Sequence, residues 1–305
     1  MTGDHHTQAE PRVSVIVVVY NERKRIADCL ASLRGQRFES AAVETIVIDD
    51  GSDDGTPDVV EETFPEARLI RKANEGADLS RNRGIEESRG RIIAFLDSDC
   101  VARPDWVASM VAALDERPAS VAGGRVVHRG PLLRRVTGIA DFGEYQGEVG
   151  RTVRSLPTCN LGLRRSTLGG VRFDPRVASA GGDTVFTECL RRGGATLRYE
   201  PRMVVEHRPP AGFADFVRRS RRYGASFVRA RRADPGLRYA GLIRAGIPGV
   251  VAAAAARTVL DWTRLLRHRR AAGFALWELP AAATALAVGR AASLPAAIRA
   301  VGEEI

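Results

Sequence analysis

Three strand-like runs decide the fold of this chain, and each leads into a cluster of polar residues. They read VSVIVVV at residues 13–19, ETIVIDDGSDDGT at residues 44–56 and IAFLDSD at residues 93–99. Continuous runs of β-branched and apolar residues are typical of strands that are buried on both faces of a parallel sheet. Segments with helical spacing separate these runs, so the order predicts an α/β domain with helices on both faces of the sheet.

The residues between the runs mark where helices begin and end. Ile26, Leu30 and Leu33 recur at helical spacing, and we expect Asn21 to cap that helix and Gly35 to end it. Further strands are expected at 69–70, 91–96, 121–128, 196–199 and 204–207, helices from Pro57 and at 77–88, 105–114 and 184–192, and a loop-rich stretch over 129–157.

The composition describes a folded globular protein. The chain has 305 residues, of which 44% are hydrophobic and 27% charged, and this excludes disordered and collagen-like chains. Four cysteines form no CxxC pair, so we expect neither a zinc cage nor a disulfide framework, and a reducing, cytoplasmic compartment fits. Residues 1–12 are polar and expected to be disordered, and the apolar run 13–19 is too short for a signal peptide.

The C-terminal third carries the positive charge. Residues 201–305 hold 18 basic and 7 acidic side chains, whereas the whole chain has a net charge of +9. From Phe213 to Arg232 apolar residues recur at helical spacing among arginines, and Ala-rich apolar stretches follow at 245–256 and 271–289. A spanning helix needs about 20 apolar residues, so we expect neither stretch to cross a bilayer.

Polar clusters follow the strands at the edge where an open parallel sheet binds its ligands. They are residues 20–22, 49–50 and 97–99, and we expect them to converge in one crevice. Asp97 and Asp99 leave their strand two residues apart and so point the same way. Paired carboxylates suit Mg²⁺ or Mn²⁺ held together with substrate phosphates. Solvated turn aspartates are the alternative, because acidic turns are common.

Four segments occur in order over about ninety residues: 13–22, 44–56, 74–82 and 93–99. As a set they resemble family 2 nucleotide-sugar glycosyltransferases, and the resemblance continues more thinly to His207. It implies the GT-A fold, a Rossmann-like and mostly parallel sheet with helices on both faces. Residues 13–210 would form this domain, with a nucleotide-binding half at 13–115 and an acceptor half at 116–210, and residues 211–305 would form a helical extension.

The resemblance also implies which residues hold the nucleotide: Val18, Tyr20, Glu22, Asp50, Arg81 and Asp97. In that family Val18 and Tyr20 would line the base pocket, and Asp50 would accept a hydrogen bond from an N–H of the base, which suits uracil and also fits guanine. Arg81 would face the nucleotide or its diphosphate, and Asp97 the ribose or a metal-bound water. The alternatives are an Asx-turn at Asp50 and an ordinary surface arginine at Arg81.

Three further roles follow from the resemblance. Asp99 would bind the divalent cation directly, and His207 lies where some relatives place a third metal ligand, although a structural histidine is equally compatible. Asp183 would be the catalytic base. The family usually carries a Glu-Asp pair there, whereas this chain has Gly182 before the Asp. The alternative for Asp183 is the N-cap of the 184–192 helix.

The resemblance implies that the protein transfers a sugar, with inversion, from a nucleotide-diphosphate sugar to a hydroxyl acceptor. UDP-sugar is the preferred donor, and a lipid-linked or cell-envelope glycan precursor is a candidate acceptor. Processive synthases carry QxxRW where residues 219–223 read RSRRY, which argues against a polymer synthase. The basic, Ala-rich extension suits an anionic membrane surface at the inner face of the cell membrane, and a plain packing subdomain is the alternative.

Two other classes remain at this stage. A non-catalytic nucleotide- or carbohydrate-binding module would explain why Gly182, rather than an acidic residue, precedes Asp183. A nucleic-acid-binding protein would explain the positive charge of residues 201–305, but no recognisable module is present there, so we expect no nucleic-acid partner.

Overall fold

The structure, a computed structural model, describes residues 11–39, 42–118, 120–142, 152–177, 181–210 and 212–303. Residues 1–10, most of the segment expected to be disordered, lie outside this range. The described strands form one sheet in the order β3-β2-β1-β4-β7-β6-β8-β5. Their bounds are β1 Val13–Val19, β2 Val43–Asp49, β3 Arg68–Arg71, β4 Ile92–Asp97, β5 Cys100–Ala102, β6 Ser120–Val127, β7 Asn160–Arg164 and β8 Thr196–His207.

The sheet is mostly parallel, as the sequence predicts. Strands β1 to β4 all run in one direction, β7 runs against both of its neighbours, and β6 and β8 are parallel to each other. In this register Val18 lies opposite both Ile48 of β2 and Asp97 of β4. The carboxyl ends of β1, β2 and β4 therefore meet at one edge, where the polar clusters lie.

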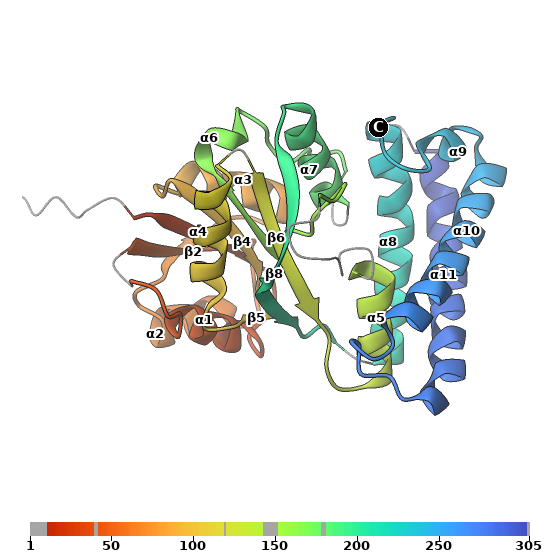
Figure 1. Ribbon diagram of the computed structural model, residues 1–305, viewed down its shortest axis with the longest axis horizontal. Helices are drawn as coiled ribbons and strands as arrows, with labels where there is room; N and C mark the ends of the chain where they lie inside the picture. Colours follow the sequence, from red (N-terminus) through yellow and green to blue (C-terminus); the bar gives the residue numbers. More distant parts are fainter. Residues whose placement is uncertain are drawn as a thin grey trace, which may run out of the picture.

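Helices cover both faces of the sheet (Figure 1). They are α1 Ile26–Arg34, α2 Thr56–Thr63, α3 Ala77–Glu87, α4 Trp106–Glu116, α5 Leu132–Phe142, α6 Arg165–Leu168 and α7 Gly182–Arg192. One core joins Val15 and Val17 of β1 to α1, α2 and α4, and the other joins Ile16 to α3 and α7. Successive side chains of a strand point to opposite faces of the sheet, so a strand covered by helices on both faces contributes to two cores.

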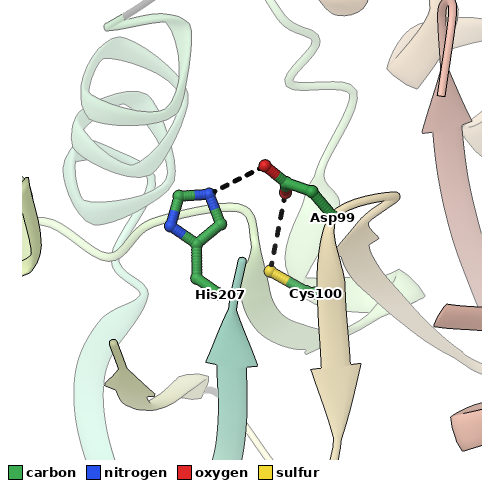
Figure 2. Close-up of side chains that lie close together, drawn as sticks. All are labelled: Asp99, Cys100 and His207. Atoms are coloured by element: carbon green, nitrogen blue, oxygen red, sulfur yellow. Dashed lines mark hydrogen bonds and ion pairs between the residues drawn. The ribbon is translucent and has the colours of Figure 1, made fainter. Parts of the chain in front are cut away.

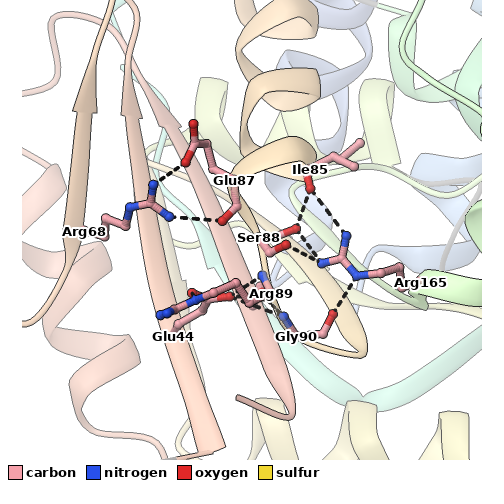
Figure 3. Close-up of polar contacts among 9 residues, drawn as sticks. Glu44, Arg68, Ile85, Glu87, Ser88, Arg89, Gly90 and Arg165 are labelled. Atoms are coloured by element: carbon pink, nitrogen blue, oxygen red, sulfur yellow. Dashed lines mark hydrogen bonds and ion pairs between the residues drawn. The ribbon is translucent and has the colours of Figure 1, made fainter. Parts of the chain in front are cut away.

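Helix α3 is fastened to the sheet at its C-terminal end (Figure 3). The guanidinium of Arg165 donates hydrogen bonds to the carbonyl oxygens of Ser88 (2.7 Å) and Gly90 (3.0 Å). Glu44 of β2 accepts from the backbone N–H of Arg89 at 2.7 Å. A cation at a helix C-terminus satisfies carbonyls that the helix leaves unpaired. The opposite end of α3, which points toward the polar edge of the sheet, is thereby held in place.

Three local expectations are wrong. Helix α5 lies inside the stretch 129–157 expected to be loop-rich, of which residues 143–151 are outside the described range. Strand β8 is continuous where two strands were expected, with an irregular register near Arg125 of β6. Asn21 does not cap α1, because the N-cap is Arg25; Asn21 has a φ of 54° and exchanges hydrogen bonds with Asp53.

The C-terminal extension is a helical bundle. It contains α8 Phe213–Ala233, α9 Ala240–Arg244, α10 Ile247–His268, η3 Leu276–Glu278 and α11 Leu279–Val301, and α8 stands between the sheet domain and the other long helices (Figure 1). A regular stripe of α11 is buried: Ala282, Leu286, Gly289, Ser293, Ala297 and Ala300. The backbone of α11 comes so close to α8 that a Cβ on Gly224 would collide with the Ser293 carbonyl.

The two apolar stretches form longer helices than the sequence suggested. The first lies mostly in α10, with 22 residues, and the second begins before η3 and ends within α11, with 23 residues. The run Leu276–Val301 is long and apolar enough to cross a membrane, so the expectation that neither stretch reaches that length is wrong for the second. Its buried stripe on α8 is, however, the pattern of a helix packed in a bundle.

Candidate active site

One large cavity opens between the polar edge of the sheet and helix α8. Its volume is about 1420 Å³, which exceeds the roughly 300–1,000 Å³ of a typical ligand pocket. All the site residues expected from the sequence line it: Val18, Tyr20, Glu22, Asp50, Arg81, Asp97, Asp99, Asp183 and His207. The structure thus brings together residues that lie up to 189 positions apart in the chain.

The loop after β2 is shaped by its own polar groups. The carboxylate of Asp49 accepts a hydrogen bond from the Ser52 N–H at 3.2 Å, which makes the Asx-type turn at Asp49 rather than at Asp50. Gly51 has a φ of 81°, and a Cβ there would lie 2.9 Å from the backbone nitrogen of Asn74. Only glycine meets both conditions without strain, so the loop can approach the chain before α3.

Asp50 is the centre of a hydrogen-bond network on the cavity wall. Its carboxylate accepts from Lys72 Nζ at 2.6 Å, from the N–H groups of Glu75 and Gly76 at 3.0 and 2.9 Å, and from Ser80 Oγ at 2.9 Å. Burial raises the pKa of Asp50, but these donors outweigh it and hold the pKa below its usual value. Asp50 is therefore a fixed, ionised acceptor at the end of β2.

Arg81 is not a surface arginine. Its side chain is 15% exposed, donates to Asp78 Oδ1 at 2.9 Å and to Asp97 Oδ1 at 3.3 Å, and lies over the Phe173 ring. Asp78 comes from the first turn of α3, and its Oδ2 is buried without a hydrogen-bond partner among the described residues. Burial raises the pKa of Asp78 despite the neighbouring guanidinium. Arg81 thus links α3 to the end of β4.

Asp99 and His207 form a pair at the junction of β4, β5 and β8 (Figure 2). The distance from His207 Nε2 to Asp99 Oδ2 is 3.1 Å, and His207 Nδ1 lies 2.7 Å from Nε2 of His128. Burial would raise the pKa of Asp99, but His207, Arg219 and Arg25 outweigh it and hold the pKa well below its usual range. Burial and His207 lower the pKa of His128, so that ring is neutral at physiological pH.

This group has the donor chemistry of a divalent cation site. Ligand atoms of Asp99, Cys100 and His207 lie within 4.8 Å of one another. A carboxylate and a neutral imidazole suit Mn²⁺, and Mg²⁺ accepts the carboxylate. Burial raises the pKa of the Cys100 thiol, which keeps it protonated and a poor ligand. With a cation bound, a neutral His128 could accept the Nδ1–H of His207, which would free the Nε2 lone pair for the cation.

Asp183 lies in the first turn of α7, close to the other carboxylates. The helix begins at Gly182 and its N-cap is Gly181, so the N-cap interpretation of Asp183 is wrong. Burial raises the pKa of Asp183 to about 6; Arg81 opposes this rise, whereas Asp78 and Asp97 add to it. A carboxylate with such a pKa is ionised at neutral pH and still basic enough to accept a proton.

Some lining residues were not expected as site residues. Arg219 of α8 donates to Asp141 of α5 at 2.9 Å and to the hydroxyl of Tyr223 at 2.8 Å. Burial raises the pKa of Tyr223, which stays a neutral donor. The sequence signal for Arg219 and Tyr223 was the RSRRY motif at residues 219–223. It was compared with the QxxRW motif of processive synthases, and no site role was assigned to its residues. Asp141 had no signal, because α5 was expected to be loop.

The comparison with known families decides the identity of the domain. The profile described as Glycosyl transferase family 2 matches residues 14–169, just over half of the chain. The chain belongs to glycosyl transferase family 2. The matched region runs from β1 to α6 and includes Asp99 and the ends of β1, β2 and β4, whereas Asp183 and His207 lie beyond it. The family expected from the four motifs is confirmed.

Relatives of this glycosyltransferase extend the similarity beyond the matched region. Glycosyltransferase AglE of Haloferax volcanii is 29% identical over 237 residues, which cover 75% of this chain and 77% of that protein. The pre-mycofactocin glycosyltransferase of Mycobacterium tuberculosis is 28% identical over 227 residues, which cover 70% of this chain and 46% of that protein. Both are proteins that this chain resembles. At these identities their substrates cannot be assigned to this chain.

Solved structures confirm the GT-A fold. The mannosyltransferase PcManGT from Pyrobaculum calidifontis, in complex with GDP-Man and Mn²⁺, superposes with a TM-score of 0.60 at 23% identity, over 94% of this chain and 78% of that chain. Residues 1–349 of S. aureus TarS in complex with UDP superpose with a TM-score of 0.53 at 20% identity, over 95% of this chain and 90% of that chain. At these identities the likeness concerns the fold.

Proposed function

We propose that this glycosyltransferase moves a sugar from a nucleotide-diphosphate donor to a hydroxyl acceptor with inversion, aided by Mg²⁺ or Mn²⁺. The observation that carries the proposal is that one cavity holds both the Asp99–His207 pair and the buried Asp183 carboxylate. A cation there would bind the diphosphate, and a base on the same wall would serve the acceptor. The paired site also disfavours a non-catalytic module, which needs neither group.

The donor would lie along the ends of β1, β2 and β4. Tyr20 is 50% exposed on the cavity lining and free to stack on a base, and Val18 lies beside it. Asp50 offers an ionised acceptor for a base N–H, on condition that the base N–H shares the carboxylate with its present donors. UDP-sugar is the first choice, since uracil offers one such N–H, and structural neighbours with bound GDP-Man and UDP support a nucleotide sugar.

The reaction would be a single displacement. The acceptor oxygen forms the new bond to the anomeric carbon while the bond from that carbon to the diphosphate oxygen breaks, and the hydroxyl proton passes to Asp183. The cation held by Asp99 and His207 would stabilise the charge on the departing diphosphate. Arg81 and Asp97 would orient the nucleotide, and Glu22, which pairs with Arg25 at 2.5 Å, would close the edge of the crevice.

The extension would attach the enzyme to an anionic membrane surface, with a lipid-linked acceptor in the cytoplasmic leaflet. Along α10 an apolar stripe is exposed on one face: Ile247, Val251, Ala255, Val259, Trp262 and Leu266. Leu276 and Trp277 are 70% and 80% exposed nearby in η3. Exposed arginines stand at both ends of α10, at Arg244 and Arg270. Apolar side chains beside cations are the pattern of interfacial binding.

Donor hydrolysis tests the enzymatic part of the proposal. The full chain is incubated with UDP-sugars and GDP-sugars, with and without Mn²⁺, and the anomeric configuration of the released sugar is read by NMR. Inversion with metal dependence is expected. A retained configuration would refute the single displacement, and nucleotide binding without turnover on any donor and acceptor would instead favour the non-catalytic module.

Vesicle flotation tests the membrane part. Binding should rise with the fraction of anionic lipid and fall when both Leu276 and Trp277 are changed to Ser. Phe213→Ser is the matched control, since this side chain is 62% exposed at the start of α8 and belongs neither to the stripe of α10 nor to η3. Equal flotation of the double variant and wild type would contradict membrane attachment through this surface.

A further inference from the structure

The cavity has two chemically different walls. On the sheet side, up to residue 115, the described lining residues carry one basic side chain, Arg81, and a set of carboxylates: Glu22, Asp50, Glu75, Asp78, Asp97 and Asp99. From α8 onward the described lining residues include no carboxylate but a row of arginines: Arg219, Arg222, Arg231, Arg238, Arg257 and Arg264. The candidate metal site and the arginine wall therefore line the same cavity.

Part of this arginine wall makes no direct ion pair with a described residue, although Asp261 and Asp141 partly offset the charge of Arg257. Arg219 pairs with Asp141, and Arg264 contacts Asp261. Among the described residues no carboxylate pairs with Arg222, Arg238 or Arg257. These three, which we call the arginine cluster, come from α8, from the chain between α8 and α9, and from α10.

Arg257 is the most constrained member of the arginine cluster. Its guanidinium lies over the Phe227 ring, 4.2 Å from the centroid, and makes no ion pair with a described residue. Burial, reinforced by Arg290 and Arg231, lowers its pKa well below its usual value. A guanidinium held in this way is electrostatically unfavourable until an anion approaches it.

The position of the arginine cluster indicates which ligand would bind there. Helix α8 packs on the loop before Asp183, because a Cβ on Gly181 would lie 3.3 Å from Ala230. Tyr223 of α8 and Asp183 are near enough to influence each other electrostatically. The cluster thus lines the same cavity as Asp183, on helices that pack beside the start of α7, and we assign this wall to the acceptor. A cavity of about 1420 Å³ has room for a second ligand there.

We propose that Arg222, Arg238 and Arg257 bind a phosphate or diphosphate group carried by the acceptor. The inference rests on the proposed function, since it assigns this wall to the acceptor of the same reaction. Guanidinium groups fit phosphate oxygens through paired hydrogen bonds and keep their charge at any physiological pH once an anion is bound. The phosphate of a lipid-linked glycan and that of a soluble sugar phosphate share this chemistry.

Calorimetry on the full chain tests the site. The protein is first saturated with UDP and Mn²⁺ and is then titrated with citronellyl phosphate, glucose 1-phosphate or neutral citronellol. The test variant changes both Arg222 and Arg257 to Gln. The matched control changes Arg221 and Arg267 to Gln, because these exposed arginines lie on the same two helices outside the cavity lining.

Each lost charge-assisted contact should weaken phosphate binding roughly tenfold or more, so the test variant should lose at least about 100-fold while the control stays within about twofold of wild type. Binding of citronellyl phosphate alone indicates a lipid-linked acceptor, and equal binding of both phosphates indicates a soluble one. Citronellol binding as tightly as its phosphate, or a test variant that binds like wild type, overturns the proposal.

Two outcomes separate this inference from the proposed function. Failure of UDP and Mn²⁺ to bind refutes the donor site, and the phosphate titration is then read on the free protein with the same variants. If the double variant has a lower melting temperature than the control, Arg238→Gln replaces it, since this exposed side chain lies outside the helices, stacks on the ring of Tyr239, and makes no ion pair with a described residue. Unchanged phosphate affinity in Arg238→Gln then also overturns the proposal.

Discussion

Asp183→Asn should remove the catalytic base and leave the donor site intact. General-base catalysis is typically worth about 10²–10⁴ in rate, and an amide cannot accept the proton. The structure also gives the pH at which the base is lost, because burial raises the pKa of Asp183 to about 6. At pH 5 roughly nine in ten molecules would carry a protonated Asp183, against roughly one in thirty at pH 7.5.

The wild-type enzyme should therefore lose activity on the acid side with an apparent pKa near 6, about tenfold for each pH unit below it. The assay is kcat/KM against pH at saturating Mn²⁺, with nucleotide affinity measured in parallel. Asp78→Asn should move this acid limb to lower pH, since Asp78 adds to the raised pKa of Asp183. Asp115→Asn is the control, because this carboxylate pairs with Arg164 and does not line the cavity.

Wild-type turnover in Asp183→Asn, with an unchanged circular dichroism spectrum, would refute the reasoning. So would an acid limb near pH 4, which is the ordinary range of an exposed aspartate. Loss of nucleotide binding in the variant would show instead that Asp183 holds the donor.

Three further outcomes follow from the site. Asp99→Asn should abolish the Mn²⁺-dependent part of UDP affinity measured by calorimetry, because an amide oxygen is a weak ligand for a hard cation; unchanged metal dependence would contradict the assignment. His128→Phe should weaken Mn²⁺ binding about 10–100-fold, read by electron paramagnetic resonance, with UDP affinity in the absence of metal unchanged; wild-type Mn²⁺ affinity would show that His128 does not orient His207. Gly182→Glu should lower the melting temperature and activity rather than improve them; an active, stable variant would count against the packing described below.

The sheet edge could be predicted from the sequence because its signals are local. The strand-like runs alternate with segments of helical spacing, which predicts a parallel sheet. Parallel strands place their carboxyl ends at one edge of the sheet, whatever the conformation of the loops. The Asp99–His207 pair, our candidate metal site, was predictable in part for the same reason, since Asp99 follows β4 directly. Its connection to His207 needed the family resemblance, because His207 comes more than 100 residues later in the chain.

The acceptor side of the cavity could not be predicted in this way. Its wall comes from α5, α8 and α10, and these helices carry no turn motif that points into a site. The helical spacing of residues 213–232 identified α8, but an arginine-rich face is usually solvated, so nothing local separated Arg222 from Arg221. Only the packing of α10 and α11 against α8 shows which arginines line the cavity.

The missing acidic residue before Asp183 has an explanation in the packing. A Cβ on Gly182 would lie 2.1 Å from Asp78 Oδ2, so the carboxylate of Asp78 occupies the space that a side chain at position 182 would need. That oxygen is buried, has no hydrogen-bond partner among the described residues, and helps to raise the pKa of Asp183. An acidic group therefore stands beside Asp183 even though the sequence lacks one at that position. It is supplied by α3, whose first turn carries Asp78 and Arg81, so the same turn that reaches Asp97 also adjusts the base.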